Sequence, residues 1–405
     1  METKKNQLHW GSFGVESLAL KYGTPLYIYD AGIVRERYGD IVKNIKYPYL
    51  KIHYAIKANS NLAILRLLKK EGANVESVSR GSVMLALKAG FKPNQIIYTC
   101  NGAEEEELKF LVENHIRINI DSLNQLEKWG QIAPGTKVGL RLNLDLHSGS
   151  HAHLRTGGKK SKFGIHFSKV KEAKKIALKY KLQIVGLHQH IGTDTLIPKP
   201  YIQAMKALTK VAHQFGNLEY LDFGSGLSIP YKPGQEPLDL KEFGKQFDKV
   251  MDAFVRDYGK EIEAIMEPGR YLVAESGTLI AKVTDVKENP GGTFIAINTG
   301  MGHLIRPSMY GAYHKIINAS SIKGKKIKVT VVGNICETGD TFGIDREIVF
   351  PQEGDFIALM DAGAYGFTMS SFYNARVRPA EILIDIDGTH MIRKRQDTKE
   401  ALPYF

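Results

Sequence analysis

From residue 50 to residue 270 the chain alternates short β-rich runs with longer amphipathic segments. The runs are LKIHYAIK (50–57), ANVESV (73–78), QIIYTC (95–100), IRINI (116–120), TKVGLRLN (136–143), LQIVGLHQH (182–190), NLEYLDF (217–223) and EIEAIME (261–267). The segments between them place apolar residues three and four positions apart, which is typical of helices. Eight strands with helical crossovers in about 220 residues predict an α/β fold, a (β/α)8 barrel of the TIM type.

A doubly wound open sheet is the competing interpretation of this alternation. No Gly-x-Gly-x-x-Gly sequence follows the first predicted strand, which weighs against a dinucleotide-binding fold. We therefore expect a barrel domain over residues 31–272.

The sequence changes character after residue 270. Segments 278–288, 293–299, 325–333, 355–361 and 381–395 are β-rich, with few helical segments between them. This pattern predicts an all-β domain. The early segment TPLYIYD (24–30) also reads as a strand, so we assign residues 1–30 and 273–405 together to this second domain.

Charge and cysteine content limit the partners and the location that we expect. The 405-residue chain has a net charge of +12, but its lysines are spread through mixed-sign runs. A solvated basic surface fits this pattern better than a nucleic-acid interface, with steering of anionic substrates as a weaker alternative. Two cysteines indicate a reducing compartment, and we find neither a signal sequence nor an apolar run of about 18 residues. We expect a cytoplasmic protein without a membrane partner.

Unusual residues stand at the ends of four predicted strands, and in a barrel these ends meet at one face. Lys57 ends the first strand, His190 ends the sixth, GSGLSIPY (224–231) follows the seventh, and EPGR (267–270) begins at the end of the eighth. Each has an ordinary explanation when taken alone, such as a lysine that reaches solvent or a packed histidine. Their common position argues for a functional site.

A metal site, with metal-dependent hydrolysis, is the weakest interpretation of this region. His188 and His190 alternate along one strand and therefore share a face, as metal ligands would. No aspartate or glutamate completes the site at the usual strand ends, although Glu267 could contribute, so we expect no metal. The glycine- and histidine-rich connection that includes residues 147–166 is long enough to be a functional loop, and its role stays open.

Together the four features match the needs of pyridoxal phosphate. This cofactor needs an amine to hold its aldehyde as a Schiff base, which among side chains only lysine supplies, so we assign that role to Lys57. Glu267 would keep the ring nitrogen protonated, and His190 would lie against the ring. Gly224 and Gly226 would let backbone N–H groups approach the phosphate, since no Cβ intervenes.

Six short motifs follow one another along the chain: YAIKAN, HIG, the glycine-rich loop, EPGR, CETGD and GAYG. In this order, over about residues 24–385, the chain resembles the fold-type III pyridoxal phosphate-dependent decarboxylases, and among them those specific for diaminopimelate. The resemblance implies an alanine racemase-like architecture, in which the β-domain completes the active site and the dimer interface. It also implies a homodimer with shared active sites.

The resemblance also assigns roles to individual residues. Lys57, Cys336, His190 and Glu267 would be catalytic, with Cys336 as the proton donor. The cofactor would be held by Lys57, His190, Gly224, Gly226, Glu267, Gly269, Arg270 and Tyr365. The substrate would be held by Arg270, Arg306, Tyr310, Glu337 and Tyr365. Cys336 and Glu337 would reach the site from the other subunit of the dimer.

Two departures from the family pattern concern serines. Ser225 and Ser228 replace two glycines of the usual Gly-Gly-Gly-Leu-Gly loop. Serine still offers its N–H and adds a hydroxyl, so phosphate binding is retained with less certain geometry. Ser82 replaces a glutamate after the second strand, which removes one expected polar contact near the cofactor.

The activity implied by the resemblance is decarboxylation of meso-2,6-diaminopimelate to L-lysine and CO2, the last step of lysine biosynthesis. The distal end of this substrate carries an ammonium and a carboxylate, which Glu337, Arg270 and Arg306 suit. Burying two arginines without a carboxylate would cost on the order of several kcal/mol per ion, which disfavours ornithine or arginine as substrate. A carboxynorspermidine-type substrate stays open.

Two further alternatives belong to other classes. An amino-acid racemase of this fold would favour arginine over Glu267 at the ring nitrogen, because arginine limits delocalisation of the carbanion. A cofactor-free homologue that acts by binding a partner would not need Lys57, Glu267 and Cys336 together.

Overall fold

The structure, a computed structural model, describes residues 2–4, 6–146, 158, 160–192 and 195–404. The chain forms two compact units. One unit consists of Arg35–Ile229 and Glu236–Leu272, and the other of Met1–Val34, Pro230–Gln235 and Val273–Phe405.

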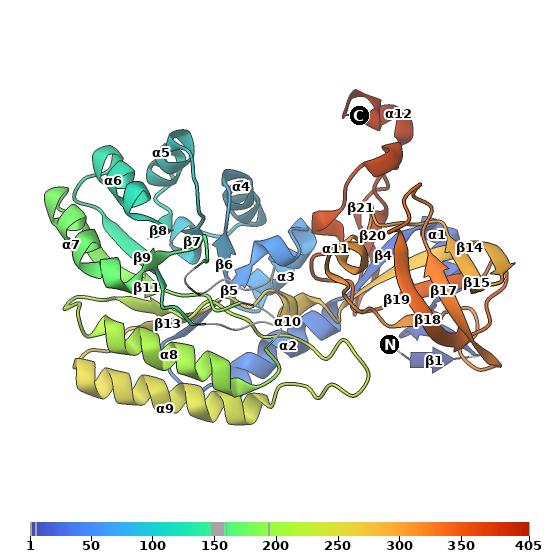
Figure 1. Cartoon of the computed structure of the whole chain (residues 1–405), viewed down its shortest axis with the longest axis horizontal. Helices are drawn as coiled ribbons and strands as arrows, with labels where there is room; N and C mark the ends of the chain where they lie inside the picture. Colours follow the sequence, from blue (N-terminus) through green and yellow to red (C-terminus); the bar gives the residue numbers. More distant parts are fainter. Residues whose placement is uncertain (1, 5, 147–157, 159, 193–194, 405) are drawn as a thin grey trace. The chain divides into compact units, whose positions relative to one another are not determined.

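Eight parallel strands form a closed barrel in the first unit (Figure 1), which confirms the predicted (β/α)8 fold. Neighbours pair in chain order, and the last strand closes the ring by pairing with the first through Ala264 and Leu50. The strands are β5 (Leu50–Ala55), β6 (Asn74–Ser77), β7 (Ile96–Thr99), β8 (Arg117–Ile120), β9 (Lys137–Asn143), β11 (Gln183–His188), β12 (Tyr220–Asp222) and β13 (Glu263–Met266). A short strand, β10 (Ile165–His166), pairs alongside β9.

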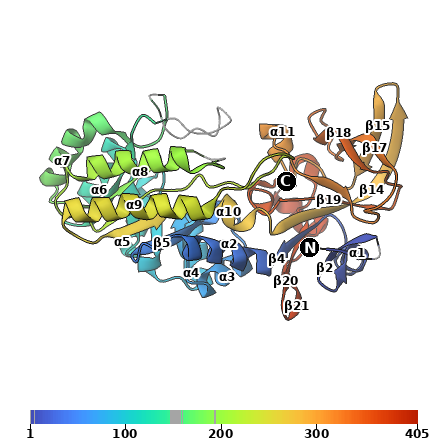
Figure 2. The ribbon, with the colours of Figure 1, turned by 90° about the horizontal axis from the view of Figure 1, so that it is seen from below.

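Helices connect these strands and cover the outside of the barrel, where α8 and α9 lie side by side (Figures 1 and 2). Each helix buries one apolar face, as Phe243, Phe247 and Phe254 of α9 show. The helices are α2 (Ala31–Asn44), α3 (Leu62–Lys70), α4 (Arg80–Ala89), α5 (Glu105–Glu113), α6 (Leu123–Ile132), α7 (Val170–Lys179), α8 (Pro198–Ala212), α9 (Leu240–Tyr258) and α10 (Arg270–Val273).

The side chain of Tyr220 fills part of the barrel interior and leaves no room for a side chain at two neighbouring positions, which are glycines. A Cβ at Gly139 would lie 2.1 Å from the Tyr220 hydroxyl, and a Cβ at Gly186 would lie 2.0 Å from the Tyr220 ring. The hydroxyl donates a hydrogen bond to Asn119 Oδ1 at 2.7 Å. The interior is therefore packed and contains an ordered polar layer beneath the strand ends.

The second unit contains a mixed sheet, in the order β18-β17-β15-β14-β4-β20-β21, with β16 and β19 joined to it through β14. As expected, the segment after residue 24 joins this sheet, as β4 (Leu26–Asp30). The other strands are β14 (Gly277–Asn289), β15 (Gly292–Ile297), β16 (Ile316–Asn318), β17 (Lys326–Val332), β18 (Thr341–Val349), β19 (Phe356–Leu359), β20 (Ala380–Asp385) and β21 (Gly388–Arg393). Strands β16 and β18 were not expected from the sequence pattern.

Smaller elements complete the second unit. They are β1 (Glu2–Lys4), β2 (Gln7–Trp10), β3 (Phe13–Gly14), α1 (Val15–Tyr22), α11 (Arg306–Tyr310) and α12 (Thr398–Ala401). Leu18, Ile28 and Ile382 belong to the apolar core that α1 and the sheet share. Among the described residues, no helix combines the length and the apolar character needed to cross a membrane.

Candidate active site

The strand ends of the barrel bring together three of the predicted catalytic residues. We predicted that Lys57 ends the first strand. It lies instead in a 3-10 turn (Ile56–Ala58) directly after β5. His190 lies beyond the end of β11 at His188, and Glu267 follows β13 directly. Because parallel barrel strands end at one face, the three side chains meet there.

Lys57 contacts a carboxylate that the sequence analysis did not identify. Its Nζ lies 2.7 Å from Oε2 of Glu76, near the end of the neighbouring strand β6. Glu76 is only 2% exposed. Burial raises the pKa of Glu76 to about 7, although the charge of Lys57 opposes the rise. A charged residue inside the otherwise apolar run ANVESV was the available signal.

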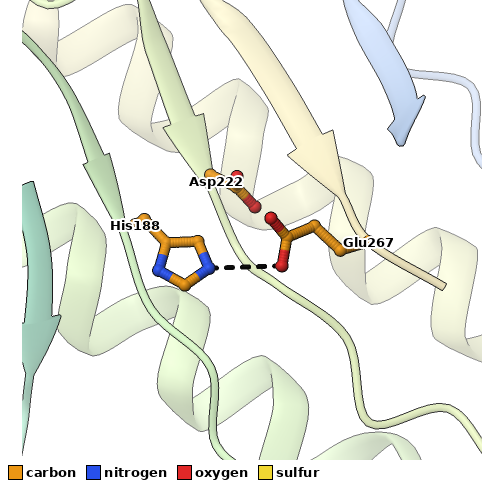
Figure 3. Close-up of side chains that lie close together, drawn as sticks. All are labelled: His188, Asp222 and Glu267. Atoms are coloured by element: carbon orange, nitrogen blue, oxygen red, sulfur yellow. Dashed lines mark hydrogen bonds and ion pairs between the residues drawn. The ribbon is translucent and has the colours of Figure 1, made fainter. Parts of the chain in front are cut away.

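Glu267 belongs to a buried cluster with His188 and Asp222, which come from three adjacent strand ends (Figure 3). Glu267 Oε2 lies 3.2 Å from His188 Nε2, and one potential ligand atom of each residue lies within 4.8 Å of the others. The expectation that no aspartate or glutamate completes a ligand set at these strand ends was therefore wrong, because two carboxylates accompany His188. Asp222 was not predicted from the sequence, where its only signal is its place near the end of NLEYLDF.

The two carboxyl groups of this cluster differ in charge. Burial raises the pKa of Asp222 well above its ordinary value, and the adjacent Glu267 raises it further. Burial also acts to raise the pKa of Glu267, but the contact with His188 and the charge of Lys57 outweigh it and hold that pKa below its ordinary value. Burial lowers the pKa of His188. Glu267 is therefore the charged carboxylate.

His190 is held as a neutral imidazole. Burial, followed by the charge of Lys57, lowers its pKa to about 3. Its Nδ1 accepts a hydrogen bond from the backbone N–H of Ser225 at 3.2 Å. The hydroxyl of Ser225 accepts from the N–H of Leu227 at 3.3 Å. The N–H of Ser225, which we expected to be available to the phosphate, therefore orients His190 in this structure.

Glycine is required at two positions of the loop after β12. Gly224 and Gly226 have φ angles of +59° and +147°. A Cβ at Gly224 would lie 2.5 Å from the carbonyl oxygen of Gln189, and one at Gly226 would lie 2.8 Å from that of Gly192. The loop after β12 is thus pressed against the loop after β11. Side chains other than hydrogen do not fit here.

The remaining barrel residues adjoin the same strand ends. A Cβ at Gly269 would lie 3.0 Å from Cβ of Ala58, so the EPGR turn packs closely on the turn that contains Lys57. Arg270 begins α10 and is 7% exposed. Ser228 is buried, and its hydroxyl lies 3.5 Å from the carbonyl oxygen of Ile229.

Arg306 occupies a buried position in the second unit, at the start of α11. Its Nη1 lies 2.9 Å from Nε2 of His314, and its guanidinium lies 4.8 Å from the centre of the Tyr231 ring. Tyr310 ends the same helix and is partly buried. Tyr365 has a φ of +56°, a conformation that is rare outside glycine and that functional sites often contain.

Cys336 and Glu337 lie on an exposed loop of the second unit, between β17 and β18. The buried carboxylate of Asp340 organises this loop. It accepts hydrogen bonds from the N–H groups of Ile335 at 2.7 Å and Met301 at 2.5 Å. An exposed thiol and carboxylate on a well-anchored loop are available to another molecule.

Ser82 has a local structural role. Its hydroxyl accepts hydrogen bonds from the N–H groups of Val78 at 2.9 Å and Ser79 at 3.0 Å, while Ser79 Oγ accepts from Ser82 N at 3.1 Å. This capping box begins α4. Most of the histidine-rich loop at 147–166 lies outside the described residues.

Comparison with known proteins identifies the class of this protein. Residues 32–274 match the family described as "Pyridoxal-dependent decarboxylase, pyridoxal binding domain". The chain belongs to this family and is a pyridoxal phosphate-dependent carboxy-lyase.

Individual relatives agree over nearly the whole chain. The diaminopimelate decarboxylase of Methanothermobacter thermautotrophicus is 38% identical, over 98% of this chain and 95% of its own. That of Aquifex aeolicus is 36% identical, over 98% and 95%. The crystal structure of diaminopimelate decarboxylase from M. jannaschii in complex with L-lysine superposes with a TM-score of 0.93 at 32% identity, covering 100% of this chain and 96% of the other.

The residues present fit the cofactor of this family. Among the described residues, Glu267 Oε1 is buried without a hydrogen-bond partner, as an acceptor that awaits a protonated ring nitrogen would be. Gly224 packs directly against His190, which allows the glycine loop to approach the imidazole that would lie against the ring. Lys57 supplies the amine, next to Glu76.

Proposed function

We propose that this protein decarboxylates meso-2,6-diaminopimelate to L-lysine and CO2, the last step of lysine biosynthesis. The similarity to diaminopimelate decarboxylases over nearly the full chain supports this substrate. The observation that carries it in the structure is the buried guanidinium of Arg306, stacked on Tyr231. A guanidinium suits bidentate binding of a carboxylate, and diaminopimelate has a distal carboxylate that ornithine and arginine lack.

We infer the following roles in the barrel. Lys57 binds the aldehyde of pyridoxal phosphate, and Glu267 binds its ring nitrogen. When bound, the cofactor accepts the electron pair that the departing carboxyl group leaves on the α-carbon. Glu76, with a pKa of about 7, holds or returns a proton at Lys57 Nζ. His190 packs against the ring. Because its imidazole is neutral, it does not compete with the protonated ring nitrogen for an ion pair with Glu267.

Further residues bind the phosphate and the substrate in this proposal. The backbone of Gly224, Gly226 and Gly269 supports the phosphate. Arg270 and Tyr365 contact cofactor and substrate, and Arg306, Tyr310 and Glu337 bind the distal end of the substrate.

We propose that Cys336 delivers the proton that replaces CO2 on the α-carbon. The exposure of Cys336 and Glu337 supports their contribution to a neighbouring subunit, in a homodimer with shared sites. Cys100 and Cys336 are both free thiols, which supports a reducing, cytoplasmic location.

The decisive experiment measures CO2 release from the meso isomer, with and without added pyridoxal phosphate. We expect release that depends on the cofactor and that Lys57→Ala abolishes together with the visible-edge absorbance of the bound cofactor. A carboxynorspermidine-type substrate, ornithine and arginine serve as competing substrates, and loss of α-hydrogen stereochemistry without CO2 would indicate a racemase. A protein that binds the cofactor but turns over only another diamino acid would refute the proposal.

A further inference from the structure

The cluster of His188, Asp222 and Glu267 contains one more ionisable carboxyl group than the cofactor needs (Figure 3). The three residues are 1%, 0% and 5% exposed. Two carboxylates that both carried a charge in this space would repel one another strongly, so one carboxyl group retains its proton. The contacts decide which one.

Glu267 is placed to carry the charge. Its backbone N–H donates to the carbonyl oxygen of Gly224 at 2.7 Å, which fixes the residue at the end of β13. Its Oε2 receives the Nε2–H of His188 at 3.2 Å. The buried Nδ1 of His188 has no hydrogen-bond partner among the described residues. A neutral imidazole therefore carries its proton on Nε2, where it donates to Glu267.

Asp222 is fixed behind Glu267 and has little support for a charge. Its Oδ1 accepts one hydrogen bond, from Gly224 N at 2.9 Å. Its Oδ2 lies at a long 3.4 Å from Asn119 Nδ2, which also donates to Thr99 Oγ1 at 3.0 Å. Tyr220 holds the other side of the same amide, so Asn119 cannot turn to give Asp222 a stronger donor. The carboxyl groups of Asp222 and Glu267 face one another (Figure 3).

The wider surroundings favour the same assignment. The charge of Lys57 acts on Glu267 and helps to keep it ionised. Asp222 instead experiences the negative potential of Glu267 and Glu76. Burial and this potential raise the pKa of Asp222, in the direction that the contacts indicate.

We propose that Asp222 is a neutral carboxylic acid that donates its O–H to Glu267, and that it acts with His188 as a positioning residue for that carboxylate. The inference rests on the proposed role of Glu267 at the ring nitrogen. His188 would then hold Oε2, and Asp222 would hold the side of Oε1, which its carboxyl group faces (Figure 3), so the two neutral donors fix the plane of the carboxylate that the cofactor meets. Glu267 then carries the single negative charge of the cluster and keeps the ring nitrogen protonated. Asp222, as a neutral acid, does not compete for that proton.

Asparagine is the informative replacement, since its amide N–H can donate where the acid O–H does and its Oδ1 can still accept from Gly224 N. We expect Asp222→Asn to retain kcat/KM within about tenfold and to keep the absorbance spectrum of the bound cofactor. Asp222→Leu, of similar volume without a donor, should lower kcat/KM by roughly 10- to 100-fold, as loss of a supporting contact does elsewhere, and alter that spectrum. Equal losses in both variants would show that Asp222 acts as an anion and would overturn the proposal.

A second measurement is independent of cofactor and substrate. Infrared spectra of the apoprotein, with ¹³C-labelled aspartate, should contain the C=O band of a protonated acid near neutral pH, and Asp222→Asn should remove it. A change confined to the carboxylate bands would overturn the proposal, even if Asp222→Leu fails to fold. If the acid band is present while diaminopimelate is not decarboxylated, the substrate assignment fails and the protonated Asp222 stands.

Discussion

Nη1 of Arg306 lies 2.9 Å from Nε2 of His314, and this distance fixes the tautomer of a fully buried histidine. Arginine can only donate, so His314 Nε2 accepts. The imidazole proton therefore lies on Nδ1, which donates to the carbonyl oxygen of Met360 at 2.8 Å. His314 thus connects the guanidinium that we assign to the substrate carboxylate with the backbone after β19.

Two replacements of His314 separate its acceptor from its donor. Glutamine places an amide oxygen near the position of Nε2, whereas asparagine can reproduce only the donor at Nδ1. We expect His314→Asn to raise KM for diaminopimelate roughly tenfold with little change in kcat, because a hydrogen bond to a charged group is lost and ground-state binding weakens. His314→Gln should change KM much less, with unfolding temperatures of both variants as the control. Unchanged KM in both would show that Arg306 does not depend on His314.

The raised pKa of Glu76 predicts how the stability of the apoprotein depends on pH. The folded state holds this proton up to about pH 7, whereas the unfolded state releases it near 4.5. Stability from this group is therefore complete below about pH 4.5 and is lost as pH rises to about 7. Relative to Glu76→Gln, we expect the wild-type free energy of unfolding to fall by up to about 3 kcal/mol across that range. Parallel denaturation curves for the two apoproteins over the whole range would contradict the buried acid.

The sequence predicted the barrel well because its strands are buried on both faces and read as apolar runs separated by amphipathic helices. Lys57 and Glu267 were recognisable as charged residues at the ends of such runs. Glu76 and Asp222 were not, because their importance comes from which strands become neighbours and which side chains face inward. The strand β16 was missed since three residues carry too little pattern, and β18 because Asp345, Arg346 and Glu347 interrupt its apolar residues.

The capping box at the start of α4 predicts a measurable coupling between two serines. Ser79→Ala and Ser82→Ala should each destabilise the protein by about 1 kcal/mol, since the first leaves the N–H of Ser82 without its acceptor and the second leaves those of Val78 and Ser79 without theirs. Because the two hydroxyls act as one unit, the double variant should lose less than the sum. Chemical denaturation measures all three values. Strict additivity, or a loss of cofactor binding that exceeds the loss of stability, would show that Ser82 acts elsewhere.

The exposure of Cys336 predicts that inactive subunits can complement one another. Lys57→Ala lacks the amine of the barrel, and Cys336→Ala lacks the thiol on the exposed loop of the second unit. If each site combines Lys57 of one subunit with Cys336 of the partner subunit, a mixed dimer contains one complete site. Co-expression with random pairing should then restore about one quarter of the wild-type activity, while each variant alone stays inactive. A protein that remains monomeric while active, or mixed dimers as inactive as their parents, would place the thiol and the lysine of one site in the same chain.

As a control, co-expression of Lys57→Ala with Glu76→Ala should restore nothing beyond the Glu76→Ala activity. Both changes lie in the barrel, so each mixed dimer has one barrel of each kind and no barrel without a substitution.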